Sequence, residues 1–104
     1  MTQAHGNIIV TFDLWCTYNT RHPSYRIYVD GLLMTGRTYV WQNPTYFVRE
    51  TVPLYVSAGL HYLTIENLNP DISVFSIQNF KLNGVPAMFR HDTGKFNVDI
   101  KDLK

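Results

Sequence analysis

Short runs in which apolar and polar residues alternate fill most of this 104-residue chain. The first run covers residues 7–16, and every second residue in it, starting at Ile8, is apolar. A period of two is typical of a β-strand with one buried face. No segment between residues 25 and 82 has room for a helix between its turn signals. The pattern therefore predicts an antiparallel all-β protein.

Dipeptides that favour tight turns separate several of these runs. Asp30-Gly31 supplies the two positive-φ residues of a type I′ turn, which predicts a hairpin with strands at 25–29 and 32–35. A second hairpin is predicted at 85–101, because two alternating runs flank a four-residue loop there. Ala58-Gly59 is a further turn, before a strand in which Leu63 should face the core.

Two irregular runs indicate how the strands are arranged. Pro53 interrupts the run 46–56, and a proline inside a strand indicates an edge position, a bulge or a change of sheet. The alternation over 72–82 changes phase twice, and a β-bulge would cause a phase change of this kind. A single sheet of eight or nine strands would leave one face open. We therefore expect one domain, 1–104, that folds as a two-sheet β-sandwich of the jelly-roll type.

The composition favours a protein partner or a sugar over a nucleic acid. Charged residues make up 16% of the chain, against about 25% in ordinary soluble proteins. The net charge is +1 and the basic residues form no cluster, which argues against nucleic-acid binding. Seven Tyr, six Phe and two Trp are present. A surface rich in Tyr and poor in charge suits burial against another subunit or stacking on a sugar ring.

The sequence gives no export or membrane signal. The first residues lack the charged start and apolar stretch of a signal peptide, and no run reaches transmembrane length. We expect a chain that is kept or assembled in a cytoplasm, without membrane contact. The one cysteine, Cys16, is in phase with the apolar residues of the first strand, so a buried and unreactive thiol is expected.

No motif for catalysis is present, and we expect no enzyme activity and no cofactor. None of the four histidines lies in a sequence that would activate a serine, threonine or cysteine nucleophile. The carboxylates are spread singly, although two could still meet in space. Asn67, Asn69 and Asp71 alternate in one loop, which is a weak calcium-like arrangement. The alternative is that these three residues only form the turn.

Aromatic residues are the best candidates for a binding surface. Five of them are expected on or near faces opposite the core positions, namely Tyr28, Tyr39, Trp41, Tyr46 and Tyr55. Rings of this kind, with Asn, Gln or Arg nearby, can hold a glycan. Two alternatives are that the rings fill the core or that they are buried against a neighbouring subunit.

Two segments carry a family resemblance. One is 22–31, which ends in Val29-Asp30-Gly31, and the other is 56–67, which contains Ala58-Gly59-Leu60-His61. Both resemble the jelly-roll carbohydrate-binding modules and their galactose-binding-like relatives, and the run ending in Leu82-Asn83-Gly84 is similar to the closing strand of those modules. The resemblance implies the sandwich fold and a glycan ligand. Of the acidic loop residues that hold calcium and sugar in the xylan-binding members, only Asp71 stands near the corresponding place.

The favoured hypothesis is a non-catalytic structural or binding subunit of a larger assembly. Small free-standing jelly rolls without export signals are familiar as phage virion proteins, so a capsid decoration protein or a tail or fibre component is expected by analogy. In this hypothesis an edge strand or the hairpin 85–101 joins the sheet of a neighbour, either another copy or another capsid or tail protein. The alternative is a carbohydrate-binding module that recognises glycans through surface aromatics.

Overall fold

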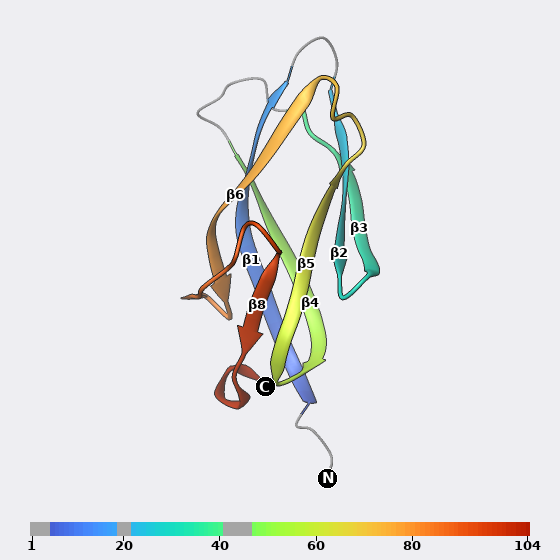
Figure 1. The fold of residues 1–104 in the computed structure, drawn as a ribbon. Helices are drawn as coiled ribbons and strands as arrows, with labels where there is room; N and C mark the ends of the chain where they lie inside the picture. Colours follow the sequence, from blue (N-terminus) through green and yellow to red (C-terminus); the bar gives the residue numbers. More distant parts are fainter. Residues whose placement is uncertain (1–4, 19–21, 41–46) are drawn as a thin grey trace.

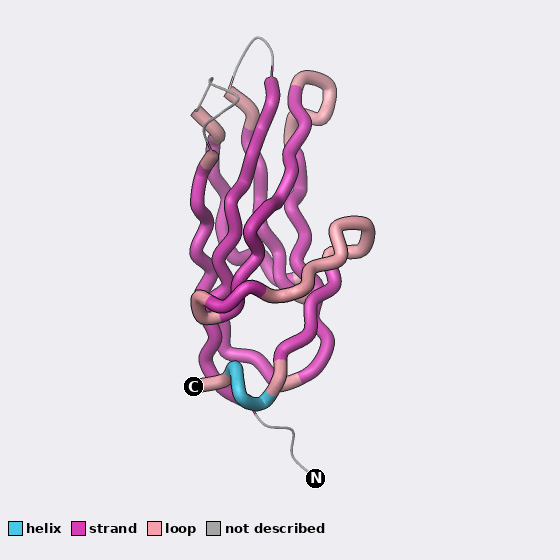
Figure 2. Tube along the Cα trace, turned by 90° about the vertical axis from the view of Figure 1, so that its left-hand side faces the viewer, coloured by secondary structure: helices cyan, strands magenta, loops and turns pink. Residues whose placement is uncertain are grey.

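The computed structural model describes residues 5–18, 22–40 and 47–104. The elements are β1 (His5–Tyr18), β2 (Ser24–Val29), β3 (Leu32–Thr38), β4 (Val48–Ser57), β5 (Gly59–Asn67), β6 (Ser73–Leu82), β7 (Val85–Pro86), β8 (Lys95–Val98) and the short 3-10 helix η1 (Ile100–Asp102). Figure 2 shows the strands along the length of the molecule and η1 at the end where the C-terminus lies. Within the described ranges, no helix has the length and apolar character needed to cross a membrane.

The strands form two antiparallel sheets that pack face to face (Figure 1). Sheet I has the order β4-β1-β6-β7, and sheet II has the order β3-β2-β5-β8. The prediction of an all-β sandwich is confirmed, and the eight strands in the described part of the chain agree with the predicted eight or nine.

Two hairpins stay within one sheet, and both use the same kind of turn. The β2–β3 turn has Asp30 at φ 51° and Gly31 at φ 81°, as predicted. The β6–β7 turn has Asn83 at φ 51° and Gly84 at φ 80°. Positive φ at both central residues is the requirement of a type I′ turn. The other connections between strands cross from one sheet to the other.

The predicted hairpin at 85–101 is wrong as a paired unit. β7 pairs with β6 in sheet I, whereas β8 pairs with β5 in sheet II. The two arms meet only at the bridge between Arg90 and Lys95. The physical reason is the type I′ turn at Asn83-Gly84, which returns the chain along β6 and so commits its next residues to sheet I.

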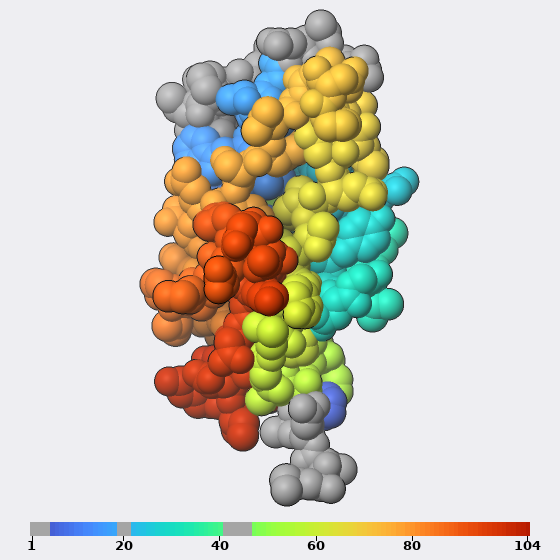
Figure 3. Space-filling model, viewed as in Figure 1, coloured from blue at the N-terminus to red at the C-terminus, as the bar shows by residue number. Residues whose placement is uncertain are grey.

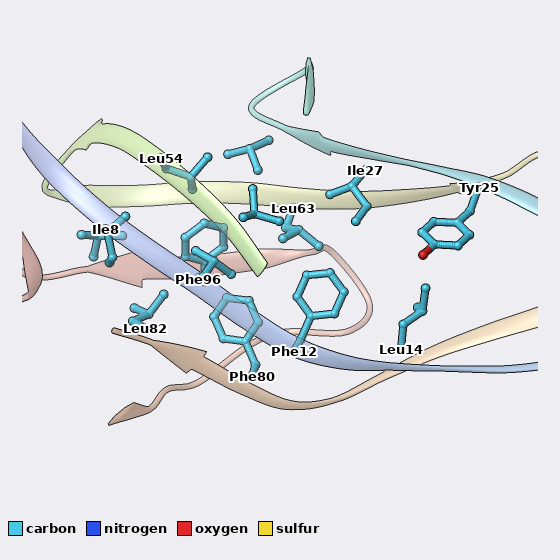
Figure 4. Close-up of a cluster of buried hydrophobic side chains, with 14 of the residues drawn as sticks. Ile8, Phe12, Leu14, Tyr25, Ile27, Leu54, Leu63, Phe80, Leu82 and Phe96 are labelled. Atoms are coloured by element: carbon cyan, nitrogen blue, oxygen red, sulfur yellow. The ribbon is translucent and has the colours of Figure 1, made fainter. Parts of the chain in front are cut away.

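The core lies between the sheets and contains the side chains that the alternation predicts (Figure 4). In β1 the buried set is Ile8, Val10, Phe12, Leu14 and Cys16. Sheet II contributes Tyr25, Ile27, Leu63 and Phe96, among others. Both sheets supply every second residue of their strands to one interior. The residues that alternate with these buried ones face outward and form the surface that a partner can contact.

The two irregularities in the pattern have the expected causes. Pro53 lies in β4, which is one of the two border strands of sheet I, where a residue without an N–H is tolerated. Between the β1 residues Thr11 and Asp13, the register with β6 shifts by one residue, so two residues of β6 lie opposite one residue of β1. Asn79 has φ 55° at this place. The phase change therefore marks a β-bulge.

Candidate interaction surface

Among the described strands, the most exposed apolar one is β3, which is one of the two border strands of sheet II. Leu32, Leu33 and Met34 are 67%, 57% and 36% exposed. Every residue of β3 except Thr35 is exposed, and in the described part of the chain β3 pairs only with β2. We call Leu32–Thr38 the β3 edge. An unpaired strand edge that carries apolar side chains is a template for another chain.

A β-bulge sets the direction of the side chains on the β3 edge. Ile27 pairs with Thr35 and Tyr28 pairs with Leu33, so Met34 has no partner in the register. Paired residues point to the same face of a sheet. Leu33 therefore lies beside Tyr28 on the outer face of sheet II, while Met34 is the extra residue of the bulge.

A buried carboxylate ties the β3 edge to the other sheet. Arg37 Nε of β3 donates to Glu50 Oε2 of β4 over 3.1 Å. The hydroxyl of the buried Tyr25 donates to Glu50 Oε1. Burial, followed by the hydrogen bond and the charge of Glu50, raises the pKa of Tyr25. The Glu50 side chain is almost fully buried, so its two donors compensate the cost of removing a charge from water.

A second polar group fixes the β2–β3 turn. Asp30 Oδ2 lies 2.6 Å from His61 Nδ1, and Asp30 Oδ1 accepts from the Tyr62 N–H over 2.9 Å. The other ring nitrogen of His61, Nε2, lies 2.7 Å from the Ser57 carbonyl oxygen. The imidazole therefore connects the turn that precedes β3 to the crossing from β4 to β5.

The predicted aromatic surface does not form from the tyrosines that the structure describes. Tyr39 is only 1% exposed and its ring contacts those of Tyr18 and Phe75 between the sheets. Its expected surface position is therefore wrong. The Tyr39 N–H donates to the Pro23 carbonyl oxygen, so Tyr39 lies two residues beyond Arg37, which pairs with Tyr25. Tyr39 therefore points to the same inner face of sheet II as Tyr25.

Tyr28 and Tyr55 lie on different sheets. Tyr28 is half-buried on the outer face of sheet II, and its hydroxyl donates to Glu66 Oε1 over 3.3 Å. Tyr55 is 69% exposed on β4 in sheet I and stacks on His5, with ring centroids 6.0 Å apart. The two rings cannot contact one sugar. Trp41 and Tyr46 lie outside the described residues.

A different aromatic group lies on the outer face of sheet I. The rings of Trp15 and Phe47 are 5.0 Å apart, and the Arg49 guanidinium lies 5.7 Å from the centre of the Phe47 ring. Arg49 Nε also donates to Asp13 Oδ1 over 2.9 Å, and Asn79 Nδ2 donates to Asp13 Oδ2 over 2.8 Å. Sequence reasoning missed Phe47. Trp15 was a visible signal, because it is out of phase with the buried residues of β1.

Despite burial, the hydrogen bonds and positive charges in this group lower the pKa of Asp13. Burial alone would raise the pKa of its carboxyl group. The hydrogen bonds from Arg49 and Asn79, with the positive charges of Arg49 and Lys81, outweigh burial and hold the pKa below its ordinary value of 3.8. Asp13 is therefore ionised at neutral pH and serves as a structural partner for Arg49.

A groove of about 610 Å³ opens on the side of the sandwich opposite to the β3 edge. It lies between β5 and β6, beyond the short strands β8 and β7, and the 91–94 turn borders it. Ile65, Phe75 and Ile77 face this groove and are only half-buried. Figure 3 shows β6 (orange) and β5 (yellow) on this side of the molecule.

Comparison with protein-family models, with curated proteins and with solved structures gave no match.

The three calcium candidates lie in the turn between β5 and β6. Asn67 Oδ1 accepts from the Asn69 N–H over 2.8 Å and from Ser73 Oγ over 3.0 Å. Asn69 Oδ1 accepts from the Ser24 N–H over 2.8 Å, and Asp71 is exposed. Both amide oxygens are thus occupied by donors, as in the turn-forming alternative. Among the described residues, no three His, Cys, Asp or Glu side chains are placed to hold a metal ion.

Three candidate groups for a nucleophile or base, Cys16, His22 and His91, are held in structural contacts. Cys16 is buried, as predicted, and burial raises the pKa of its thiol to about 11. An activated cysteine needs a lowered pKa instead. His22 Nδ1 lies 2.9 Å from the Tyr18 hydroxyl, and the ring of His91 packs edge-on to Phe89. These contacts place no acid–base pair beside the thiol.

Proposed function

We propose that this chain is a non-catalytic β-sandwich subunit that assembles with other protein subunits through its uncovered apolar surface. The observation that carries the proposal is the β3 edge, where Leu32, Leu33 and Met34 are exposed on a strand whose outer side pairs with no other described strand. Proteins that function alone blunt such edges with charges, prolines or a covering loop. An edge left apolar suits a strand that another chain covers.

The opposite side of the molecule supports the same proposal. The groove between β5 and β6 leaves Ile65, Phe75 and Ile77 half-buried although all three point inward. A sandwich with apolar surface on two opposite sides suits a subunit with a neighbour on each side. The low charged fraction of 16% agrees with a surface that is buried in an assembly.

The most specific form of the proposal is a phage virion protein, either a capsid decoration protein or a tail or fibre component. Its support is an analogy with small free-standing jelly-roll virion proteins, based on one small sandwich domain with an apolar border strand. In that setting the chain is a repeated structural subunit and its partners are capsid or tail proteins.

A carbohydrate-binding module is the second candidate, and one observation favours it. Trp15, Phe47 and Arg49 place two rings and a cation side by side on the outer face of sheet I, where a sugar ring could stack. Binding to a glycan array that is lost in Phe47→Ala, with Tyr55→Ala as the control, would favour this candidate. Absence of binding across the array, with and without calcium, would exclude it.

The proposed function is tested by the mass of the purified chain in solution. Sedimentation velocity over a dilution series should show species heavier than the 12.1 kDa chain that dissociate on dilution. A single species of 12.1 kDa at every concentration would refute assembly of the chain with further copies of itself.

A further inference from the structure

We propose that the β3 edge pairs with the β3 edge of a second copy of this chain, antiparallel and about a two-fold axis, so that sheet II continues from one subunit into the other. This inference rests on the proposed function and names the partner of the same surface. Four observations carry it: the state of the other borders, the direction of the free backbone groups, the charge of the strand, and its glycine.

The other border strands carry features that discourage pairing. β4 contains Pro53 and the exposed cation Arg49. β7 has two residues, one of which is Pro86, and β8 has four residues and begins with Lys95. Prolines, charges and short length are the ways in which proteins protect their sheet edges. β3 has seven residues and no proline, so it is the border strand most open to pairing among the described strands.

Backbone groups of β3 are directed toward the open side. The Tyr39 N–H donates to the Pro23 carbonyl oxygen, and β2 residues 25 and 27 pair with Arg37 and Thr35. In an antiparallel ladder, bonded and non-bonded pairs alternate. The N–H and C=O groups of Gly36 and Thr38 therefore point away from β2. The Ser24 carbonyl agrees with this assignment, because it accepts from the N–H of Leu68, the residue that follows β5 on the other side of β2.

The charge on the strand allows two copies to meet. Arg37 is the one charged residue of β3, and Glu50 of the same chain binds its guanidinium. With the two-fold axis at Gly36, Arg37 lies opposite Thr35 of the second copy, so the two cations are not paired with each other. In this register Met34 lies opposite Thr38 of the second copy, and Leu33, three residues from the axis, lies at the end of the contact, where its apolar side chain adds to the backbone hydrogen bonds.

Gly36 has no role in the fold of the single chain that would explain a glycine. Its φ is not positive, and a Cβ atom added there would meet nothing closer than Arg26 Cγ at 3.5 Å, which is an ordinary contact. A glycine inside a strand often marks a place where another backbone approaches closely. An isologous contact needs only one self-complementary surface, and this makes a two-fold pair the simplest solution.

The pair should be weak and reversible. Seven residues of strand span about 24 Å, which is a short contact compared with interfaces that bury about 800 Å² on each partner. The β3 edge therefore supplies one contact of an assembly, and a dilution series is the correct way to observe it.

The test compares two lysine variants of similar exposure. Leu33→Lys places a charge on the β3 edge, while Ile100→Lys places one at a site that is 68% exposed and lies in η1, outside β3. By sedimentation velocity, Leu33→Lys should raise the dissociation constant about tenfold or more, a change of about 1.4 kcal/mol or more per mole of dimer. Ile100→Lys should leave it unchanged. Far-ultraviolet circular dichroism checks that both variants keep the fold.

Hydrogen exchange of the wild-type chain gives a second readout that needs no variant. The amide protons of Gly36 and Thr38 should exchange more slowly as the protein concentration rises, because they become bonded to the second copy. If the chain self-associates but these amides and Leu33→Lys show no effect, the β3 pairing is refuted and the proposed function stands. If the wild-type chain is monomeric at every concentration, the pairing of two β3 edges is refuted, whereas assembly with a different protein is not.

Discussion

The hydrogen bond between Tyr25 and Glu50 makes a sharp test of how the two sheets are held together. In Tyr25→Phe the ring keeps its place among the core side chains, and only the hydroxyl that donates to Glu50 is lost. Glu50 then keeps one described donor, Arg37, whose side chain is half exposed. Hydrogen bonds to charged groups contribute about 1.5–3 kcal/mol, and a buried acceptor left without its donor is costly. We expect the free energy of unfolding to fall by about 2 kcal/mol.

The matched control is Tyr28→Phe. The Tyr28 hydroxyl also donates to a glutamate, but Glu66 is exposed and the two oxygens are 3.3 Å apart, so the loss should stay below about 0.5 kcal/mol. Urea unfolding of the three proteins at neutral pH measures both changes, and the slope of the transition should stay the same if only native stability changes. Equal losses in Tyr25→Phe and Tyr28→Phe would refute the reasoning that burial makes the first bond important.

Three further predictions concern single residues. In urea unfolding, Gly94→Ala should destabilise the chain by about 1–3 kcal/mol more than Gly31→Ala. Both glycines have a similar positive φ, but only at Gly94 would the new Cβ lie 2.2 Å from a backbone oxygen, that of Leu63. Equal losses of stability in the two variants would contradict this prediction. The difference in unfolding free energy between wild type and Asp13→Asn should be largest at neutral pH and shrink in strong acid. The pKa of Asp13 in the folded chain lies below the 3.8 of the unfolded chain, so the stability that ionised Asp13 contributes is lost as the pH falls through the folded-state pKa. A difference that is independent of pH would contradict this prediction. The Cys16 thiol, with its pKa raised to about 11, should not react with a thiol reagent at neutral pH until the chain is unfolded, and rapid labelling of the native protein would show that the thiol is accessible.

The sequence pattern predicts those features of the fold that depend on local chemistry. The alternation from Ile8 to Cys16 identifies a strand and its buried face, and Asp30-Gly31 identifies a hairpin, because both signals act within a few residues. The phase change before Leu82 likewise locates a bulge. Each of these features is set by steric or hydrogen-bonding requirements that do not depend on distant parts of the chain.

Strand pairing between distant segments is not encoded in the same way. Asn83-Gly84 is as strong a hairpin signal as Asp30-Gly31, and following it to Val85 would have placed the next strand beside β6 rather than beside β8. An alternating pattern also does not show which of the two faces of a strand is buried when only one aromatic residue marks it. The pattern therefore does not reveal that Tyr39 points into the core. The exposed run at residues 32–34 carried a readable signal, since three consecutive apolar residues cannot all face one buried side.

The anchors of β3 link the stability of the fold to the proposed assembly. A border strand that pairs on one side only is usually mobile, yet the Arg37–Glu50 ion pair fastens β3 to β4 across the interior. If a rigid edge is what a second copy recognises, weakening this anchor should weaken pairing although Glu50 is buried away from the contact. We expect Glu50→Gln to lower self-association in sedimentation velocity and to speed amide exchange along β3 in the monomer. Asp13→Asn is the control, because Asp13 is a buried carboxylate that pairs with Arg49 on the outer face of sheet I. If Asp13→Asn lowers self-association as much as Glu50→Gln does, the effect is one of global stability and the anchoring role of Glu50 is refuted.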